Sequence, residues 1–264
     1  MIDTKKNKSQ YSINTPYEVE ELRDKFVQEG KLEDFKKTYS YSYPEIKNTN
    51  TGNFWDDKFD SPENLTDQDG MTREKIDFLI SLLPKKKVKI LDLGIGQGYV
   101  EQRLKQRGIN HEIYGIDISE NSIRRSAENF KGNFLVGDIL KINKFYKKDF
   151  FDVVIAIEVI EHVSPKDTLN LFKQINSLLK KNGNFIISTP INEGLEKINI
   201  NPSAHVRAYT IPILKAEFEV SGFRIKTIKT FYAFKSFYEI KKILARIFRN
   251  RWQPNNVVIL GRKI

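Results

Sequence analysis

Short apolar runs alternate with stretches of helical periodicity over most of the chain after residue 71. A helical pattern begins at Thr72, and apolar runs typical of buried strands then occur at 88–93, 112–117, 134–136, 153–157 and 185–188. Helical patterns separate these runs, and this alternation predicts a doubly wound α/β fold around a parallel sheet. In such a sheet, ligands gather at the carboxyl ends of the strands.

The two ends of the chain depart from this alternation. Residues 1–70 are polar and irregular, with a helical stretch from about Tyr17 to Lys37, and we expect an N-terminal helical cap or lid there. Four aromatic residues of this region could close over a substrate: Tyr41, Tyr43, Phe54 and Trp55. Residues 71–264 form the main domain. Its last two strands, FRIKTIKTF and VVILGRK, enclose a basic aromatic insertion at 231–256.

A glycine-spaced turn follows the first predicted strand, in the sequence KILDLGIGQGYV. Gly94, Gly96 and Gly98 allow a tight turn and a close approach to a ligand before a helix begins near Tyr99. A dinucleotide fingerprint needs its third glycine at position 99, which is tyrosine, so a dinucleotide is disfavoured. Asp92 precedes the turn and suits a positively charged ligand, because a carboxylate would repel a pyrophosphate. A sulfonium with an amino acid tail fits this loop.

Two more acids end the next two predicted strands. Asp117 lies about 20 residues after the loop, where an acid can accept hydrogen bonds from ribose hydroxyls. Asp138 ends the third strand and could accept from an adenine amino group, with Ile118 and Ile139 on either side of the ring. The sequence therefore predicts an adenosine-containing ligand.

The motifs DLGIGQG, YGIDIS, VGDIL, FDVVIAIEVIEHV and LLKKNGNFIISTP occur in this order. In order and spacing the chain resembles the class I S-adenosylmethionine-dependent methyltransferases from about Met71 onwards, and most of all the ubiquinone-biosynthesis O-methyltransferase-like and small-molecule or glycan branches. The resemblance implies a Rossmann-like seven-stranded sheet with the last strand antiparallel, and S-adenosylmethionine as cofactor. It places Asp92 near the methionine part, Asp117 on the ribose, and Asp138 with Ile139 at the adenine. The remaining expected cofactor-binding residues are Gly94, Ile95, Gly96, Gly98, Ile118 and Glu158.

The segment EVIEHV after the fourth strand carries the candidate chemistry. Glu158, Glu161 and His162 would project to one side if a helical turn begins here. The segment AHVRAYT after the fifth strand brings His205, Arg207 and Tyr209 to the same end of the sheet. We predict Glu161, His162 and His205 as catalytic residues. Together with Glu158 they could hold Mg²⁺, Mn²⁺ or Zn²⁺. In the competing interpretation, Glu158 holds the cofactor amino group, Glu161 is solvated and His162 packs against the sheet edge.

Three functions remain open at this level. The first is methyl transfer to a hydroxyl of a small molecule or glycan, helped by a histidine base or a metal. The second is RNA ribose 2′-O-methylation, because a similar set binds metal in the small-RNA 3′-terminal methyltransferases, although the acid of their histidine-arginine motif is missing before His205. The third is a non-catalytic scaffold, which would have little need for the complete acidic set.

Charge and cysteine content restrict the possible partners and chemistry only partly. The formal net charge is +10, which suggests RNA or an anionic membrane as partner, although widely spread lysines also account for it. The segment 231–252 concentrates basic residues around apolar positions at helical spacing. The chain has no cysteine, which excludes disulfides and thiolate chemistry. Without a long apolar run or an apolar leader, we expect a cytoplasmic protein, with peripheral membrane contact through the basic segment as an alternative.

Overall fold

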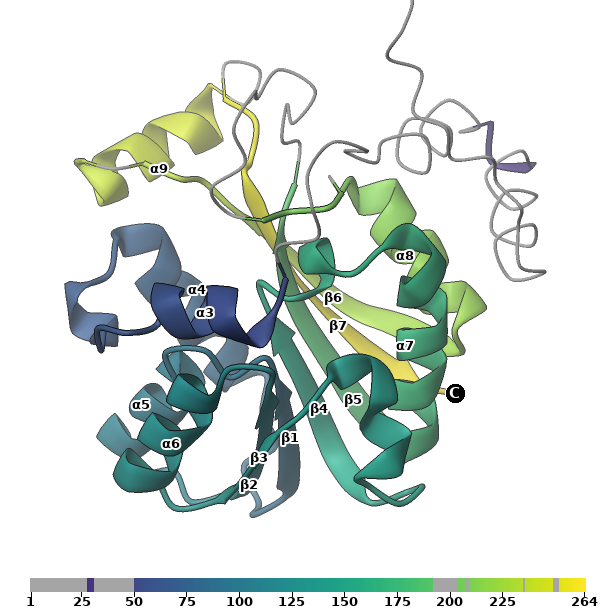
Figure 1. Cartoon of the computed structure of the whole chain (residues 1–264). Helices are drawn as coiled ribbons and strands as arrows, with labels where there is room; N and C mark the ends of the chain where they lie inside the picture. Colours follow the sequence, from purple (N-terminus) through teal and green to yellow (C-terminus); the bar gives the residue numbers. More distant parts are fainter. Residues whose placement is uncertain (1–27, 31–49, 192–203, 208, 235, 249–251) are drawn as a thin grey trace, which may run out of the picture.

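A seven-stranded sheet forms the centre of the protein in the computed structural model, which describes residues 28–30, 50–191, 204–207, 209–234, 236–248 and 252–264 (Figure 1). The strand order is β3-β2-β1-β4-β5-β7-β6. The strands are β1 (Lys89–Leu93), β2 (Glu112–Asp117), β3 (Asn133–Val136), β4 (Phe151–Ile157), β5 (Leu179–Pro190), β6 (Phe223–Phe231) and β7 (Asn256–Lys263).

The first five strands are parallel, and β7 is antiparallel to both of its neighbours, β5 and β6. This confirms the expected doubly wound, seven-stranded sheet with an antiparallel last strand. Because β6 runs in the same direction as β5, β6 ends and β7 begins at the edge where the parallel strands have their carboxyl ends. The insertion between β6 and β7 therefore lies at that edge.

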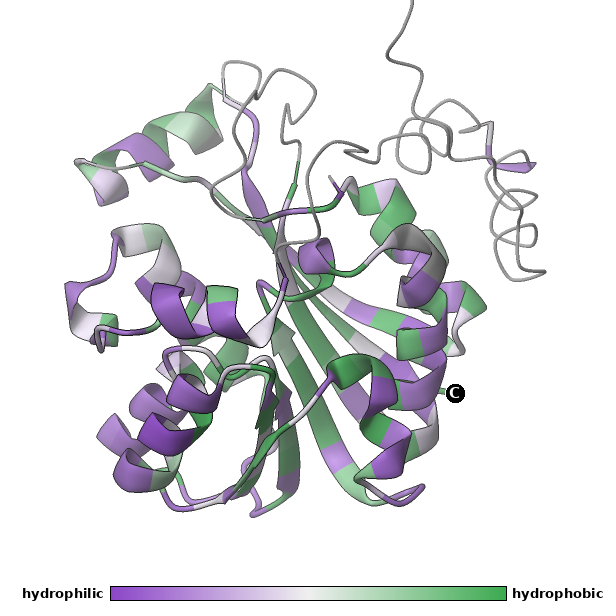
Figure 2. Cartoon of the chain, in the orientation of Figure 1, coloured by the Kyte–Doolittle hydropathy of each residue, from purple (hydrophilic) through white to green (hydrophobic). Residues whose placement is uncertain are grey.

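Helices cover both faces of the sheet. The helices are α3 (Gly52–Lys58), α4 (Gly70–Ser81), α5 (Tyr99–Gln106), α6 (Glu120–Asn129), α7 (Pro165–Leu178), α8 (Ile211–Val220) and α9 (Tyr238–Ile247), with short 3₁₀ turns η1 (Leu65–Asp67), η2 (Ile139–Lys144) and η3 (Ile160–His162). Residues from α4 and α5 pack on one face and residues from α7 and α8 on the other. The central strands of the sheet are apolar, and the sides of the helices that face away from the sheet are polar, as the amphipathic patterns predict (Figure 2).

The observed elements extend the predicted ones at several places. The strand predicted at 153–157 begins earlier, at Phe151, and the strand predicted at 185–188 spans Leu179–Pro190. The fifth strand includes a turn at Asn182, whose positive φ of 62° interrupts the apolar pattern that sequence analysis relies on. The predicted helix near 17–37 and the aromatics Tyr41 and Tyr43 lie outside the described residues, apart from residues 28–30. From the expected cap, the structure describes α3 and η1.

Candidate active site

A cavity of about 700 Å³ lies at the carboxyl edge of the parallel strands. Its wall combines the glycine loop, the residues that follow β2, β3 and β4, and residues 205–206, while α3 contributes Trp55 and Lys58. The cavity brings together most of the predicted cofactor-binding residues, namely Asp92, Gly94, Ile95, Gly96, Asp117, Ile118, Asp138, Ile139 and Glu158. Gly98 does not line the cavity.

Positive backbone angles explain the glycines of the loop. Gly94, Gly96 and Gly98 have φ of 70°, 51° and 68°, which L side chains rarely adopt. A Cβ at Gly94 would lie 2.6 Å from the Val159 side chain. Gly98 precedes the first residue of α5 as its N-cap, so its contribution is to the turn into that helix.

Asp117 and Asp138 are held by backbone amides at the ends of their strands. The Asp117 carboxylate accepts hydrogen bonds from the Gly96 amide at 2.9 Å and the Ser119 amide at 2.8 Å. Asp138 accepts from the Leu140 amide at 2.9 Å and pairs with Lys141 at 3.0 Å. Because a carboxylate has about four acceptor positions, each acid can still accept from a ligand in the cavity.

Asp92 lies beside a second buried acid, Glu101 of α5, and both are 3% exposed. Three of their carboxyl oxygens have no hydrogen-bond partner among the described residues: Oδ1 of Asp92 and both oxygens of Glu101. Burial raises the pKa of Glu101 to about 7. Burial, together with the neighbouring Glu101 and Asp117 carboxyls, raises the pKa of Asp92 well above its usual value. Two adjacent buried carboxyls favour a cationic ligand group beside them.

Glu158 does not join Glu161 and His162 on one helical face, so this part of the prediction is wrong. The helical turn η3 begins only at Ile160, and Glu158 has a left-handed φ of 53°. Its carboxylate instead pairs with Lys75 at 2.9 Å and accepts hydrogen bonds from Ser188 and Asn256. Burial alone would raise its pKa, but Lys75 and these hydrogen bonds lower it, and the group is held as a carboxylate.

Glu161, His162 and His205 do come together. One side-chain oxygen or nitrogen from each lies within 4.8 Å of the other two. Glu161 is fully buried and accepts a hydrogen bond from Thr189 at 3.0 Å, and its backbone carbonyl accepts from the Val206 amide at 2.9 Å. This backbone bond joins η3 to the segment that carries His205. Of the four expected metal ligands, Glu158 lies outside this group, and its carboxylate is paired with Lys75 instead.

His162 is oriented by its neighbours. Its Nδ1 lies 3.1 Å from the Ala204 carbonyl, which can only accept, so Nδ1 carries the proton and Nε2 has the free electron pair. Burial lowers the pKa of His162 to about 4, so the ring is neutral near pH 7. The His162 ring contacts those of Trp55 and His205 edge-on, at centroid distances of 4.9 and 5.0 Å.

Arg207 and Tyr209 follow His205 but belong to the core. Arg207 is fully buried and its guanidinium pairs with Glu217 at 2.8 Å, donates to Thr168 at 2.9 Å and lies 4.2 Å from the Tyr209 ring centre. Neither residue lines the cavity. These contacts hold the segment against α7 and α8, and thereby place His205.

Sequence reasoning missed Lys75 and Glu101. Both occupy inward positions of amphipathic helices, since Lys75 precedes the buried Leu79 by four residues and Glu101 precedes the buried Leu104 by three. The sequence does give one signal for such residues, a charged residue at an apolar position of a helical pattern. It does not identify the partner of that residue, because Lys75 and Glu158 lie on elements far apart in the sequence.

No helix in the described part of the chain has the length and apolar character to cross a membrane.

Comparison with known proteins agrees with this geometry. Residues 84–249 match the family model described as "Methyltransferase domain". The chain is 31% identical over 146 residues to a ubiquinone biosynthesis O-methyltransferase of Pelagibacter ubique, covering 54% of each chain, so it spans about half the length of that relative. It is 32% identical over 201 residues to the enzyme of the same name from Rickettsia felis, covering 67% of this chain and 75% of the relative.

A solved structure has the same fold. An S-adenosylmethionine-dependent methyltransferase from Archaeoglobus fulgidus superposes with a TM-score of 0.58, at 23% identity, covering 72% of this chain and 92% of the other. At this identity the likeness concerns the fold.

Proposed function

The chain belongs to the class I S-adenosylmethionine-dependent methyltransferases, and we propose that it methylates a hydroxyl group of a small molecule or glycan. One observation carries the proposal: the neutral His162, with its proton on Nδ1 and the lone pair on Nε2, stands beside His205 and Glu161 at the cavity that contains the cofactor loop. The ubiquinone biosynthesis relatives, whose name describes O-methylation, add support at modest identity.

The residues of the cavity suggest how the reaction proceeds. S-adenosylmethionine supplies a methyl group that its sulfonium makes electrophilic, so the protein must mainly align the acceptor and exclude water. A hydroxyl is a poor nucleophile, and His162 Nε2 can take its proton as the oxygen bonds to the methyl carbon and the carbon-sulfur bond breaks. Asp92, which lines the cavity, would lie near the cationic part of the cofactor, and Glu101 adjoins Asp92 outside the cavity lining. Trp55, which contacts His162 edge-on, covers this end of the cavity.

The same three residues also fit a divalent metal ion. A carboxylate and two imidazoles form a set of three protein ligands, and a metal ion with three protein ligands can take an acceptor oxygen as the fourth. The hydrogen bond between His162 Nδ1 and a backbone carbonyl is the outer contact typical of histidine ligands. In that case Glu161, His162 and His205 would hold the ion, which would lower the pKa of the acceptor hydroxyl.

The first test uses His162→Gln, His205→Gln and the double variant, with His111→Gln as control. His111 is the third histidine, is buried and lies outside the cavity. Methyl transfer is measured with labelled cofactor on catechols, sugars and RNA 3′ ends, and cofactor affinity by calorimetry. We expect the double variant to lose about 10²–10⁴-fold in kcat while it keeps its cofactor affinity. An unchanged rate in the double variant would contradict the proposed role.

Calorimetry of the chelator-treated protein with Mn²⁺ or Zn²⁺ alone tests the metal. Binding that Glu161→Gln and His205→Gln weaken supports metal assistance, and the absence of such binding leaves His162 as base. Transfer to RNA 3′ ends alone, with salt-dependent affinity, would favour the ribose methyltransferase alternative. Failure to bind the cofactor at all would favour the scaffold.

A further inference from the structure

Helix α9 has an unusual orientation, with its polar side toward the protein and its apolar side toward solvent. Ile240, Ile243 and Ile247 occupy positions i, i+3 and i+7, and are 59%, 55% and 65% exposed. The neighbouring Leu244 and Phe237 extend this surface, which we call the α9 apolar face. An amphipathic helix of a soluble domain ordinarily buries such a stripe.

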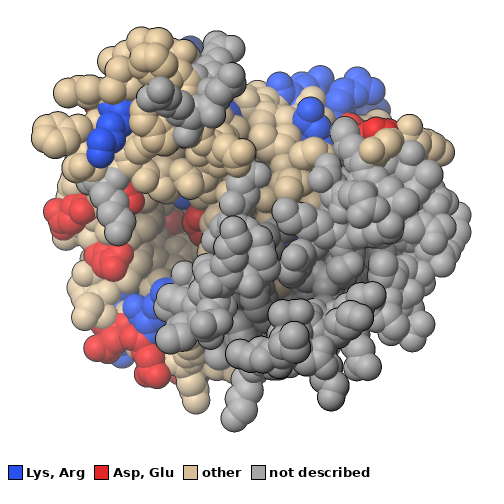
Figure 3. Space-filling model, turned by 90° about the horizontal axis from the view of Figure 1, so that it is seen from above, with Lys and Arg blue, Asp and Glu red and all other residues tan. Residues whose placement is uncertain are grey.

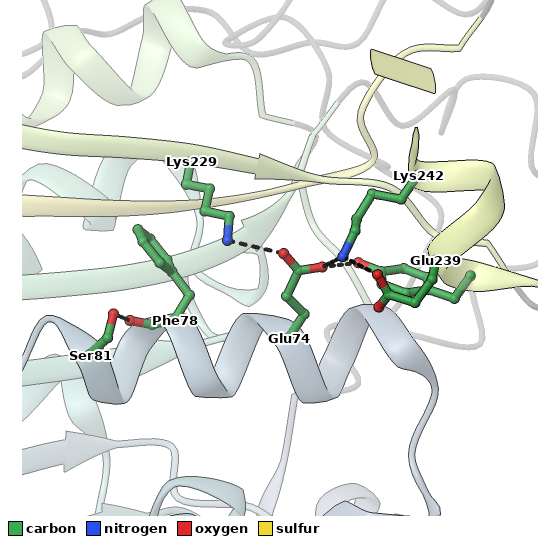
Figure 4. Close-up of polar contacts among 7 residues, drawn as sticks. Glu74, Phe78, Ser81, Lys229, Glu239 and Lys242 are labelled. Carbon is green, nitrogen blue, oxygen red and sulfur yellow. Dashed lines mark hydrogen bonds and ion pairs between the residues drawn. The ribbon is translucent and has the colours of Figure 1, made fainter. Parts of the chain in front are cut away.

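The polar side of α9 is anchored to α4 and β6 by one carboxylate, Glu74 (Figure 4). Lys242 and Lys229 pair with Glu74 at 2.9 and 3.1 Å, and the Tyr238 hydroxyl donates to it at 2.8 Å. Burial raises the pKa of Glu74, but these three partners lower it more, to about 2. The helix therefore cannot turn its apolar face inward without breaking this partly buried polar cluster.

The anchoring is also steric. Tyr238 packs so closely on the first residue of α4 that a Cβ at Gly70 would lie 2.5 Å from its ring. Ala245, on the same side of the helix, is fully buried. The outward direction of the α9 apolar face thus follows from close packing as well as from charge.

We propose that the α9 apolar face docks on an anionic membrane surface. The segment 231–252 contains six basic residues and one acidic residue. Lys242 is paired with Glu74, which leaves five basic residues in the segment to complement anionic headgroups. The aromatic rings of Tyr232, Phe234 and Trp252 lie beside one another, with centroid distances of 5.6 and 6.2 Å, and tyrosine and tryptophan favour the headgroup region. The insertion lies at the same edge of the sheet as the cavity.

Other occupants fit these features less well. A second copy of the chain would bring two equally basic segments together in a symmetric interface. RNA would use the basic residues but not the apolar stripe. On the face seen from above, blue and red side chains form several separate groups, so the described part of that face has no continuous basic track (Figure 3).

Co-sedimentation of the full chain with vesicles tests the proposal. We compare vesicles of phosphatidylcholine alone with vesicles of phosphatidylcholine and phosphatidylglycerol, at low and physiological salt. Wild-type protein should bind the mixed vesicles, more weakly at higher salt, and the triple variant Ile240→Gln/Ile243→Gln/Ile247→Gln should bind about tenfold more weakly or worse. Ile264→Gln is the matched control, because Ile264 is 72% exposed outside this face and the variant should bind normally.

Three outcomes would overturn the proposal. In the first, the wild type does not bind the mixed vesicles. In the second, the triple variant, with unchanged thermal unfolding, binds them as the wild type does. In the third outcome, ultracentrifugation shows a wild-type dimer that the triple variant loses, without vesicle binding by either. The single variant Ile247→Gln repeats the comparison with the smallest change to the fold.

Discussion

Carboxylates occur at many polar positions of the cavity wall, and the partners of each decide its charge. Glu158 remains ionised because Lys75 lies 2.9 Å away. Asp117 has backbone amides as partners, yet burial still raises its pKa. Glu101 adjoins Asp92 outside the cavity lining, and burial raises its pKa to about 7. These acidic residues thus differ in the negative charge that they can offer to a cationic ligand.

Glu101 should make stability depend on pH. Its pKa is raised from 4.5 in the unfolded chain to about 7 in the folded protein, so the unfolded state loses the proton first as pH rises. Above pH 7, Glu101→Gln should therefore be more stable than the wild type by roughly 3 kcal/mol, and below pH 4.5 the two should be equally stable. Urea unfolding of both proteins across this range measures the difference. A difference that does not vary with pH would contradict the assignment.

At the scale of elements, long-range polar contacts fix the position of helices that have few apolar contacts with the core. Helix α3 lies over the cavity, and Asp56 from this helix accepts hydrogen bonds from the Ser119 hydroxyl at 2.6 Å and the Asn121 amide at 3.0 Å. Helix α9 depends in the same way on Glu74. These polar anchors add to the packing that holds α3 over the cavity and α9 at the same edge of the sheet.

Removal of the Glu74 anchor should release α9. In Glu74→Gln we expect a loss of about 1–3 kcal/mol of stability, because Lys229 and Lys242 lose their shared carboxylate. Backbone amides of α9 should exchange hydrogen faster while those of β4 are unchanged. Glu239→Gln is the control, since this exposed acid pairs with Lys242 on the surface and should matter by less than about 1 kcal/mol. Equal effects of the two variants would argue against Glu74 as the anchor.

For the whole molecule, the cofactor cavity joins residues from most parts of the sheet and from α3. A ligand that binds only this assembled site stabilises the folded state against the unfolded state. The cofactor should therefore affect global unfolding rather than one element.

Thermal unfolding measures this linkage. At about 100 times its Kd, S-adenosylmethionine should stabilise the protein by about 2.7 kcal/mol and raise Tm by about 5–10 °C. Asp117→Ala, which removes an acceptor at the expected ribose position, should lose most of this rise at the same cofactor concentration. A rise that Asp117→Ala keeps in full would place the cofactor elsewhere.

The sheet and the cofactor loop could be predicted from the sequence because their signals are local. Apolar runs mark the buried strands. Asp92 and Asp117 lie at the carboxyl ends of β1 and β2, and Gly94 and Gly96 follow β1, so parallel topology brings them to one edge. Periodicity also placed an apolar stripe on the insertion. A local pattern shows which side chains share one face of an element, so these features could be predicted without knowledge of distant contacts.

The pairing of charges and the direction of faces depended on tertiary packing. Glu158 finds Lys75 and Asn256 on elements far away in the chain, and His162 is oriented by a carbonyl 42 residues later. Helix α9 turns its apolar face outward because Glu74 holds its polar side. A buried charge must be neutralised by whichever group the fold brings near it, and sequence spacing does not encode that group.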